Sequence, residues 1–510
     1  MKSYAALYRK YEDTRSLLKL KTYALWTVPG AFPDITNDND ATGNTDIEHD
    51  YQSIGATLVN FLAAKLTGLL FPVTQSFFKI QAEEKLIKLA AEVWGKDKSE
   101  VDNRLVQLEN KACIALFKNA SYAQLLQMII YLIITGNCLF KRVNGKLTVY
   151  SMRNYTRLCD NEGNVLDVVV KEVWAYSSLP SDIQKLVKPS GTQDEHAPVE
   201  VYTRIKYEQR ANGTVCIVSQ QINEIDIGVP SQYPENLCPY RTVVWKQVNG
   251  DSYGRGLVED HAGDFAKLSD LSRAYAMYQI NACKVVNFVK PGSTVDIDSL
   301  NGAYSGEWVQ GDIGQVAAHE AGDASKMQQL SAEIQSIFQR LSIAFMYQGN
   351  TRNAERVTAE ELQMNAREAE SALGGVYSQL SQGIHLPLSY LLCNEVDGDF
   401  IHALIAGEIT LEVITGLPAL GRSTVVTQVL QAIQELAVIV PALKQLTPRA
   451  DVEKVIDLIL QARGVNLEDI MLSPEALKQQ QEAQQQQQAQ QTAAMMGDPS
   501  QTASAIQGML

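Results

Sequence analysis

The sequence predicts an α+β protein in which helices predominate. Apolar residues recur at helical spacing over long stretches near both ends of the chain. Between them, residues 146–172 and 199–227 are rich in Val, Ile, Thr and Tyr, as β-strands are. With 510 residues, of which 45% are hydrophobic, the chain can bury a large core and form about two to four domains.

The first half begins with helices. Residues 46–71 carry leucines at a spacing that places them on one helix face, and Pro72 ends this segment. Further helices are expected over 102–119 and 122–135. The most apolar run, residues 125–140, is 16 residues long and contains polar side chains. It therefore predicts a buried helix rather than a membrane span, which needs about 20 apolar residues.

Two antiparallel strand pairs follow these helices. Residues 161–164 (NEGN) and the Asn212–Gly213 pair interrupt the β-rich stretches and are typical of tight turns, where glycine adopts positive φ at little cost. We expect a small antiparallel sheet packed beside the N-terminal helices.

Two helices then flank a short insert. The first runs from about 256 to 285, and residues 287–322 between the helices combine strand character with many glycines. The second helix shows a narrow apolar stripe, formed by Met327, Leu330, Ile334, Ile337, Leu341 and Phe345. Such a stripe indicates packing against another helix, within the chain or between subunits, although an ordinary core helix has the same pattern.

A polar turn separates this helix from the next. Residues 349–357 show no periodicity, and Thr358 and Glu361 then form a capping box that starts a long helix. Gly374 and Gly375 are expected to bend that helix, because each glycine costs about 1 kcal/mol relative to alanine. Residues 422–446 and 449–463 predict further helices. The last part, 476–510, is rich in Gln and Ala, too polar to form a core of its own, and is expected to be largely mobile.

Net charge and cysteine usage exclude some classes of function. The chain has 44 basic and 58 acidic residues, a formal charge of −14, which disfavours a protein that grips DNA. Its seven cysteines lie far apart, and we expect free thiols in a reducing cytoplasm. The N-terminus has no apolar segment of secretory length, so neither export nor a membrane partner is expected.

No catalytic motif is evident. The chain lacks a phosphate-binding glycine loop, and its six histidines show no zinc-site spacing, so we expect no metal, no cofactor and no enzyme activity. The weak exception is Glu48–His49–Asp50, which would serve a metal-dependent nuclease. In the polar turn, Arg352 and Arg356 are candidate phosphate contacts, but two solvated arginines would look the same.

The chain resembles the head-to-tail connector, or portal, proteins of T7-like podoviruses, a family of tailed bacteriophages. The resemblance rests on a colinear series of short segments that spans about residues 20 to 490. These are 23–33, 50–72, 163–170, 237–240, 251–256 (DSYGRG), 340–346, 355–361, 373–380 and the tract from Lys478.

The resemblance implies a phage portal fold, assembled as a twelve-fold ring with a central channel. Wing, stem, clip and crown regions are carried over by position as follows: 1–255, wing; 256–285, stem helix; 286–322, clip; 323–346, stem helix; 347–357, tunnel loop; 358–398, kinked wing helix; 399–475, helical crown; 476–510, tail. Asn350, Arg352 and Arg356 would then face DNA in the channel.

The same resemblance implies partners and a location. Double-stranded DNA would pass through a homododecamer at one capsid vertex during packaging and ejection, with terminase bound during packaging. Major capsid and scaffolding proteins, a tail adaptor and internal core proteins would contact the ring, which is made in the host cytoplasm and resides in the virion. A different phage structural protein, such as a tail adaptor, is the main alternative.

Overall fold

The computed structural model describes most of the first 415 residues, all within one compact unit formed by residues 1–420. The described residues are 3–32, 48–73, 76–81, 98–118, 121–186, 197–211, 213–248, 250–282, 285–293, 295–304, 307–308, 310, 312–320, 324–347, 359–399, 401–402 and 412–415. The predicted helices 422–446 and 449–463 and the Gln-rich tail lie outside this part of the chain.

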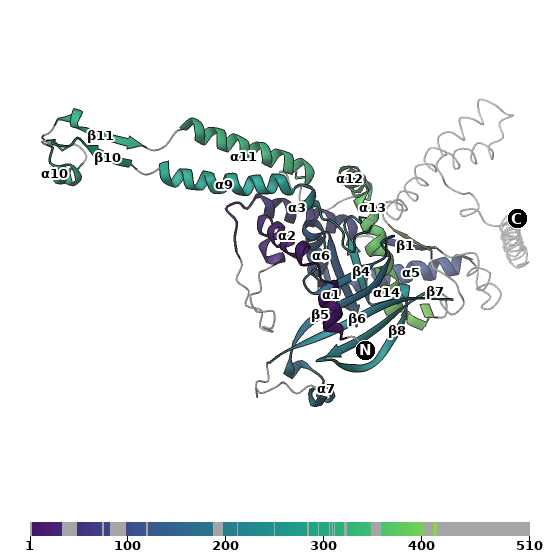
Figure 1. The fold of residues 1–510 in the computed structure, drawn as a ribbon. Helices are drawn as coiled ribbons and strands as arrows, with labels where there is room; N and C mark the ends of the chain where they lie inside the picture. Colours follow the sequence, from purple (N-terminus) through teal and green to yellow (C-terminus); the bar gives the residue numbers. More distant parts are fainter. Residues whose placement is uncertain are drawn as a thin grey trace, which may run out of the picture. The chain divides into compact units, whose positions relative to one another are not determined.

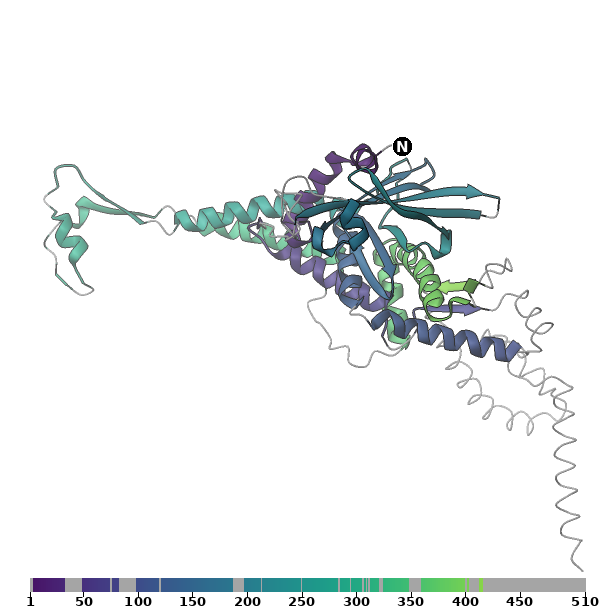
Figure 2. The ribbon, with the colours of Figure 1, turned by 90° about the horizontal axis from the view of Figure 1, so that it is seen from below.

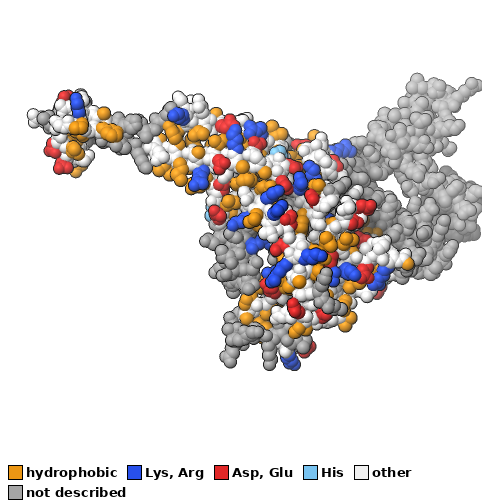
Figure 3. Space-filling view, viewed as in Figure 1, with side chains coloured by type: hydrophobic (Ala, Val, Ile, Leu, Met, Phe, Trp, Pro, Cys, Tyr) orange, Lys and Arg blue, Asp and Glu red, His pale blue; other side chains and the backbone are white. Residues whose placement is uncertain are grey.

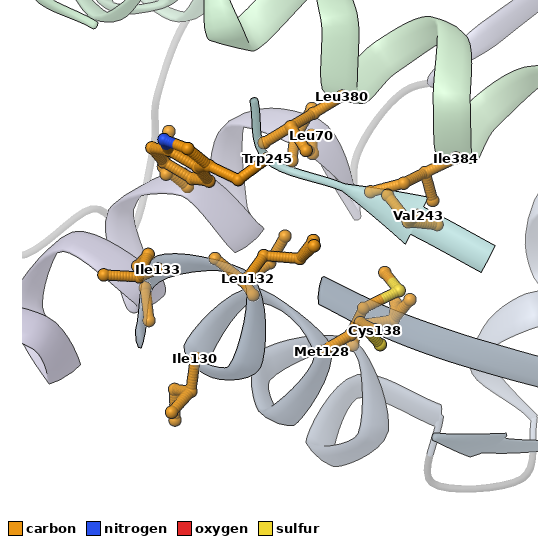
Figure 4. Close-up of a cluster of buried hydrophobic side chains, with 14 of the residues drawn as sticks. Leu70, Met128, Ile130, Leu132, Ile133, Cys138, Val243, Trp245, Leu380 and Ile384 are labelled. Carbon is orange, nitrogen blue, oxygen red and sulfur yellow. The ribbon is translucent and has the colours of Figure 1, made fainter. Parts of the chain in front are cut away.

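The principal core is helical. It is built around α3 (Ile54–Leu70), α5 (Lys98–Phe117), α6 (Ser121–Thr135) and α14 (Leu386–Val396), whose apolar side chains form one continuous cluster. Helices α1 (Tyr4–Tyr11) and α2 (Thr14–Trp26) precede them, with a 3-10 turn, η1, at Pro29–Ala31. Figure 4 shows side chains of α6 facing Val243 and Trp245 and, beyond them, Leu380 and Ile384.

The sequence predicted one buried helix over the apolar run 125–140, and this prediction is wrong. Helix α6 ends at Thr135, Gly136 takes a left-handed conformation with φ +72°, and strand β2 (Asn137–Val143) begins at the next residue. β2 is the centre of a three-stranded antiparallel sheet with β3 (Lys146–Tyr150) and β9 (Tyr240–Val244). Apolar composition alone could not distinguish the helix from the buried central strand.

A second, five-stranded sheet has the order β4-β5-β6-β7-β8, with every pair antiparallel. Its strands are β4 (Tyr155–Cys159), β5 (Val165–Ala175), β6 (Pro198–Arg210), β7 (Gly213–Ile222) and β8 (Ile225–Pro234), with the short elements η2 (Tyr176–Ser178) and α7 (Ser181–Leu186) between β5 and β6, and η3 (Glu235–Leu237) after β8. The expected antiparallel sheet beside the N-terminal helices is confirmed, because α1 packs on β4, β5 and β6. At the edge strand β8 the pairing with β7 is irregular near Val218, and Gly228 has φ +68°.

Two long helices run side by side away from this body, as Figures 1 and 2 show. The one-turn helix α8 (Leu257–Asp260) leads into α9 (Ala262–Ala282), which packs against α11 (Ala324–Ala344). The chain between them forms the ribbon of β10 (Val285–Val289) and β11 (Val316–Glu320), with α10 (Ile297–Gly302) and η4 (Ile313–Gln315). The C-terminal half of the apolar stripe packs within the chain, since Ile337, Leu341 and Phe345 are buried. Met327, Leu330 and Ile334 are only partly buried.

The predicted single kinked helix over 358–398 is divided into several elements. These are α12 (Ala359–Ala372), α13 (Val376–Leu380), a π-helical turn, η5 (Ser381–His385), and α14. The short strand β12 (Glu412–Thr415) then pairs with β1 (Phe78–Gln81), far away in the sequence. The described part of the chain contains both helices and strands in quantity, so the α+β class is confirmed. No helix in this part is long and apolar enough to span a membrane.

Candidate functional site

The α9–α11 pair leads to the polar turn predicted to face DNA, and two ion pairs cross between its helices. Arg340 donates from Nη2 to Oδ1 of Asp264 at 2.7 Å, and Lys267 pairs with Glu333. The hydrogen bond from Arg340 lowers the pKa of Asp264. These side chains are largely exposed, so solvent screens both pairs and each contributes little to the stability of the hairpin. Burial of the apolar stripe between the helices contributes more.

A well-formed C-terminal cap ends α11 just before the turn. The N–H of Met346 donates to the carbonyl of Ile343 at 3.1 Å, and the N–H of Tyr347 donates to the carbonyl of Ser342 at 2.8 Å. This is the Schellman arrangement, and Met346 takes the left-handed conformation it requires, with φ +53°. A residue other than glycine at this position is unusual, so neighbouring contacts must hold it.

Aromatic packing supplies those contacts. The Phe345 ring lies edge-on to Phe265 with centroids 5.7 Å apart, and Tyr347 packs on Phe61 at 5.0 Å and on Phe338 at 6.0 Å. Tyr347 is thereby tied to α3 as well as to α11. These contacts therefore fix the position of Tyr347, the last described residue before the polar turn.

The predicted DNA contacts Asn350, Arg352 and Arg356 lie outside the described residues, as does Thr358. Glu361 falls in α12, where the backbone is described but its side chain is not. The structure does define both ends of the turn, since α11 and α12 each pack against α3. Lys65 of α3 lies 4.0 Å from Glu368 of α12.

Gly374 and Gly375 form a sharp break between α12 and α13. Both are left-handed, with φ +62° and +87°. The N–H of Gly375 donates to the Glu370 carbonyl at 3.1 Å, and the Glu370 carboxylate accepts from the N–H of Ser378 at 2.9 Å across the break. The two glycines predicted a bend within one helix, whereas in the structure the helix ends and restarts.

The sequence did not reveal a contact between the start of β2 and the segment that leads into α8 and α9. This contact is here called the joint. The Asn137 amide donates to the Gly254 carbonyl at 2.8 Å and accepts from the Gly254 N–H at 2.7 Å. Gly136 packs so closely that an added Cβ would lie 2.2 Å from the carbonyl carbon of Arg255. The only signal in the sequence was the glycine pair of the DSYGRG segment. Its partner is 117 residues away, which no local pattern reveals.

A cavity of about 420 Å³ adjoins this joint. It is lined by Asp13, Lys19 and Tyr23 from the N-terminal helices and by Tyr253, Arg255 and Glu259 from the start of the long hairpin. Arg255 lies 3.7 Å from Asp251, and Asp13 caps α2 by accepting from the N–H groups of Arg15 and Ser16. Asp13, Asp251 and Arg255 at the cavity thus have partners within the chain.

The nuclease alternative gains no support from the geometry. Oδ1 of Asp50 accepts from the Ser269 hydroxyl at 2.8 Å, and its Oδ2 accepts from the Gln52 amide at 3.0 Å, so the carboxylate ties the start of α3 to α9. Among the described residues, no three His, Cys, Asp or Glu side chains gather as metal ligands would. The described cysteines are free thiols, and most of them are buried.

Comparison with known proteins gives the family. Residues 2–471 match the family described as "Bacteriophage head to tail connecting protein". The portal protein of Pseudomonas phage phiKMV is 37% identical over 94% of this chain and 94% of its own length. The portal protein of Enterobacteria phage T3 is 31% identical over 97% of this chain and 89% of its own.

Among solved structures, the neck of an empty gene transfer agent particle covers 81% of this chain and 90% of its own, at 12% identity and a TM-score of 0.38. The family assignment rests on the sequence matches alone, which run along nearly the whole chain. The family resemblance of the colinear segments is confirmed. This chain belongs to the family of bacteriophage head-to-tail connecting proteins.

Proposed function

We propose that this chain is the subunit of a portal ring. Copies would close around a central channel at one capsid vertex, through which viral DNA enters during packaging and leaves at ejection. The observation that best supports this proposal is the match to a known portal protein over 94% of both chains. A match of that extent covers the whole architecture and not one shared module.

The proposal extends to the regions of a portal. In this proposal residues 1–255 would form the wing, 256–285 and 323–346, which contain α9 and α11, the stem helices, and 286–322 the clip. An antiparallel pair of long helices that carries a β-ribbon between them supports this assignment. The kinked segment 358–398 completes the wing, and 399–475 would be the crown.

Partners follow from the same proposal. The ring would be a dodecamer that receives terminase during packaging and a tail adaptor afterwards, and it would contact major capsid, scaffolding and internal core proteins. It would be made in the host cytoplasm and reside in the virion. We assign the ring no bond chemistry and no cofactor, since its proposed task is to let DNA pass and to anchor partner proteins.

The charge of the chain suits a conduit. A formal charge of −14 on every copy would repel the phosphate backbone, so a duplex could slide without adhering. Local positive charge in the turn after Tyr347 could then act on DNA selectively. Arg352 and Arg356 remain the proposed channel contacts, with Asn350 beside them.

Electron microscopy of the purified full-length chain tests the ring. We expect closed rings with a central hole, twelve-fold in the main class. Particles confined to monomers or dimers under assembly conditions would contradict the proposal. Localisation at the packaging vertex, and not further along the tail, separates a portal from an adaptor.

The turn is tested by replacing Arg352 and Arg356 with Ala. Rings should still form, because the turn lies beyond the capped end of α11, whereas genome packaging or retention should change. The matched control is Lys146→Ala with Lys185→Ala, which removes the same charge from exposed sites elsewhere. Identical packaging by both double variants would show that the arginines do not contact DNA.

A further inference from the structure

Two cysteines lie where the chain passes from the five-stranded sheet to the three-stranded sheet. Cys216 is in β7, and Cys238 follows η3 just before β9. Both belong to one apolar cluster with members in both sheets, among them Ile205 of β6 and Leu139 of β2. The surface over the five-stranded sheet carries basic and acidic side chains side by side (Figure 3), whereas both cysteines are fully buried. A bond between them would tie the outer part of one sheet to the start of the other.

The two side chains are hydrogen-bonded to each other, with the Cys216 thiol as donor and the Cys238 sulfur as acceptor. The Cys238 sulfur also accepts from the Tyr240 N–H and the Tyr207 hydroxyl, and the Arg241 guanidinium attracts its negative charge. The bond from Cys216 is the largest of these effects, and together they outweigh burial and lower the pKa of Cys238. Since the thiolate is the form that attacks an oxidant, Cys238 is the nucleophile of the pair.

Other cysteines among the described residues have different surroundings. The Sγ atom of Cys113 lies 3.1 Å from the Ser76 hydroxyl, and Arg157 donates to the Sγ atom of Cys159 at 2.9 Å. Cys138 is fully buried, and burial raises the pKa of its thiol. Its reactive thiolate form is therefore rare. The arrangement of a donor thiol on a stabilised acceptor sulfur distinguishes the pair from these cysteines.

An oxidant can reach the pair when strand β8 opens. In the five-stranded sheet β8 is an edge strand that pairs with β7, and most of its residues are exposed. Tyr233 of β8 lies opposite Cys216, and the pairing of the two strands is irregular near Val218. Segments with an exposed backbone open locally far more often than a core does. Because η3 continues directly from β8, the same opening should uncover Cys238.

We propose that Cys216 and Cys238 form a redox site that closes into a disulfide when a low-molecular-weight disulfide, such as oxidised glutathione, reaches it. The Cys238 thiolate attacks one sulfur of the oxidant, which forms a mixed disulfide and releases one thiolate. The Cys216 thiol then loses its proton and attacks the Cys238 sulfur, which expels the second thiolate. The protein pair gives up two electrons and two protons, and the oxidant is reduced to two thiols.

The disulfide would act as a covalent tie. It would enclose β8 and η3 in a closed loop, which stabilises a protein mainly by restricting its unfolded chain. The reduced pair suits a reducing cytoplasm, and the disulfide suits an oxidising medium outside a cell. The inference goes beyond the proposed function, because the site lies within a single chain and needs no ring.

Peptide mapping of the purified full-length chain tests the site. The folded chain is incubated overnight in glutathione buffers of increasing oxidised fraction, quenched with acid, unfolded and alkylated. Trypsin releases both cysteines in one peptide, since residues 211–240 contain no Lys or Arg. Cleavage after Glu224 and Glu235 then separates the two cysteines unless a disulfide joins them. We expect joined fragments to replace the doubly alkylated peptide as the oxidised fraction rises.

Single variants test the order of the steps. Cys216→Ala removes the thiol that resolves the mixed disulfide, so Cys238 should accumulate a glutathione adduct. Cys238→Ala removes the nucleophile and should leave Cys216 largely unmodified. Cys138→Ala is the matched control, because it removes an equally buried thiol and should leave the yield of the disulfide unchanged.

Urea unfolding tests the tie. Oxidised wild type should unfold at a higher urea concentration than reduced wild type, and Cys216→Ala should gain nothing from the same oxidant. A wild-type peptide that stays doubly alkylated in fully oxidised glutathione would overturn the redox site. An unchanged urea midpoint after oxidation would overturn the tie. The mapping uses the wild-type chain, so it decides the question even where a variant fails to fold and whether or not rings form.

Discussion

Gly374 and Gly375 show how backbone conformation at single residues ends a helix. Both have positive φ, and the space around their Cα atoms is open, so nothing but the conformation itself excludes a side chain. Alanine in the left-handed region costs about 1–2 kcal/mol. The sequence analysis expected both glycines to lie inside one bent helix. In such a helix, replacing a glycine with alanine would stabilise the helix.

We therefore predict that Gly374→Ala lowers the free energy of unfolding by about 1 kcal/mol. Gly68→Ala is the matched control: Gly68 lies within α3, and its added Cβ would also meet open space. That change should raise stability by about 0.5–1 kcal/mol, as alanine does inside a helix. Urea unfolding measures both, and a stabilised Gly374→Ala would refute the left-handed break.

His385 is a second residue whose surroundings set its behaviour. Its ring is buried between Phe71 and Phe77, with centroids 5.2 and 4.9 Å away. Burial penalises the charged imidazolium and lowers the pKa of His385 to about 3. The unfolded chain, with an ordinary histidine pKa near 6.5, binds the proton first as pH falls.

Stability should therefore fall with decreasing pH from about 6.5 towards 3, by up to about 1.4 kcal/mol per pH unit from this one residue. Above pH 6.5 both states are neutral at this position and the contribution is flat. His385→Phe keeps an aromatic ring in the cluster and removes the proton site. The stability of wild type should fall relative to that of the variant as pH falls through this window, and parallel curves would exclude the effect.

At the scale of elements, the joint between β2 and the start of the long hairpin is held by one amide side chain. Asn137→Ala leaves the N–H and carbonyl of Gly254 without their partner in a buried position, at a cost of about 2–3 kcal/mol. Denaturant unfolding of the purified chain gives this value. Asn164→Ala is the control, because Asn164 bonds to Asp160 at the surface. Equal effects of the two changes would mean that the joint has no special role.

The elements differ in how far the sequence could predict them. The helical stripes and the turns at 161–164 and 212–213 are local patterns, so their helices and hairpins were predictable. The strand β2 was hidden inside an apolar run, and the pairing of β1 with β12 joins segments more than 300 residues apart. Local periodicity does not report such pairings.

The features of the candidate site also differ in whether a local sequence pattern could predict them. Irregularity at Gly374 and Gly375 could be predicted because glycine acts locally, although the sequence indicated a bend and not the end of the helix. The polar turn lies outside the described residues and stays a prediction. The cap at Met346 could not, since a methionine in the left-handed conformation has no sequence signal and is held by distant aromatic rings. The exposed apolar side chains between β10 and β11, such as Trp308, also could not be predicted. Their exposure depends on how little apolar surface this short segment can bury.

At the scale of the whole molecule, net charge predicts how the proposed ring would act on DNA. Chains of formal charge −14 should not retain a linear duplex in filter-binding experiments between about 50 and 200 mM salt, and any residual binding should lack the steep salt dependence of a basic DNA binder. A basic DNA-binding protein of similar size is the control. Tight, strongly salt-dependent retention would contradict a sliding conduit.

The outer strand β8 affects how copies of this chain can pair with one another. Pro230 has no N–H to offer, Gly228 turns the backbone into the left-handed region, and the irregular pairing with β7 distorts the edge further. A strand from another newly made molecule would find gaps where regular donors are needed. Such an edge discourages open-ended fibres, so concentrated solutions of the chain should resist strand-by-strand aggregation.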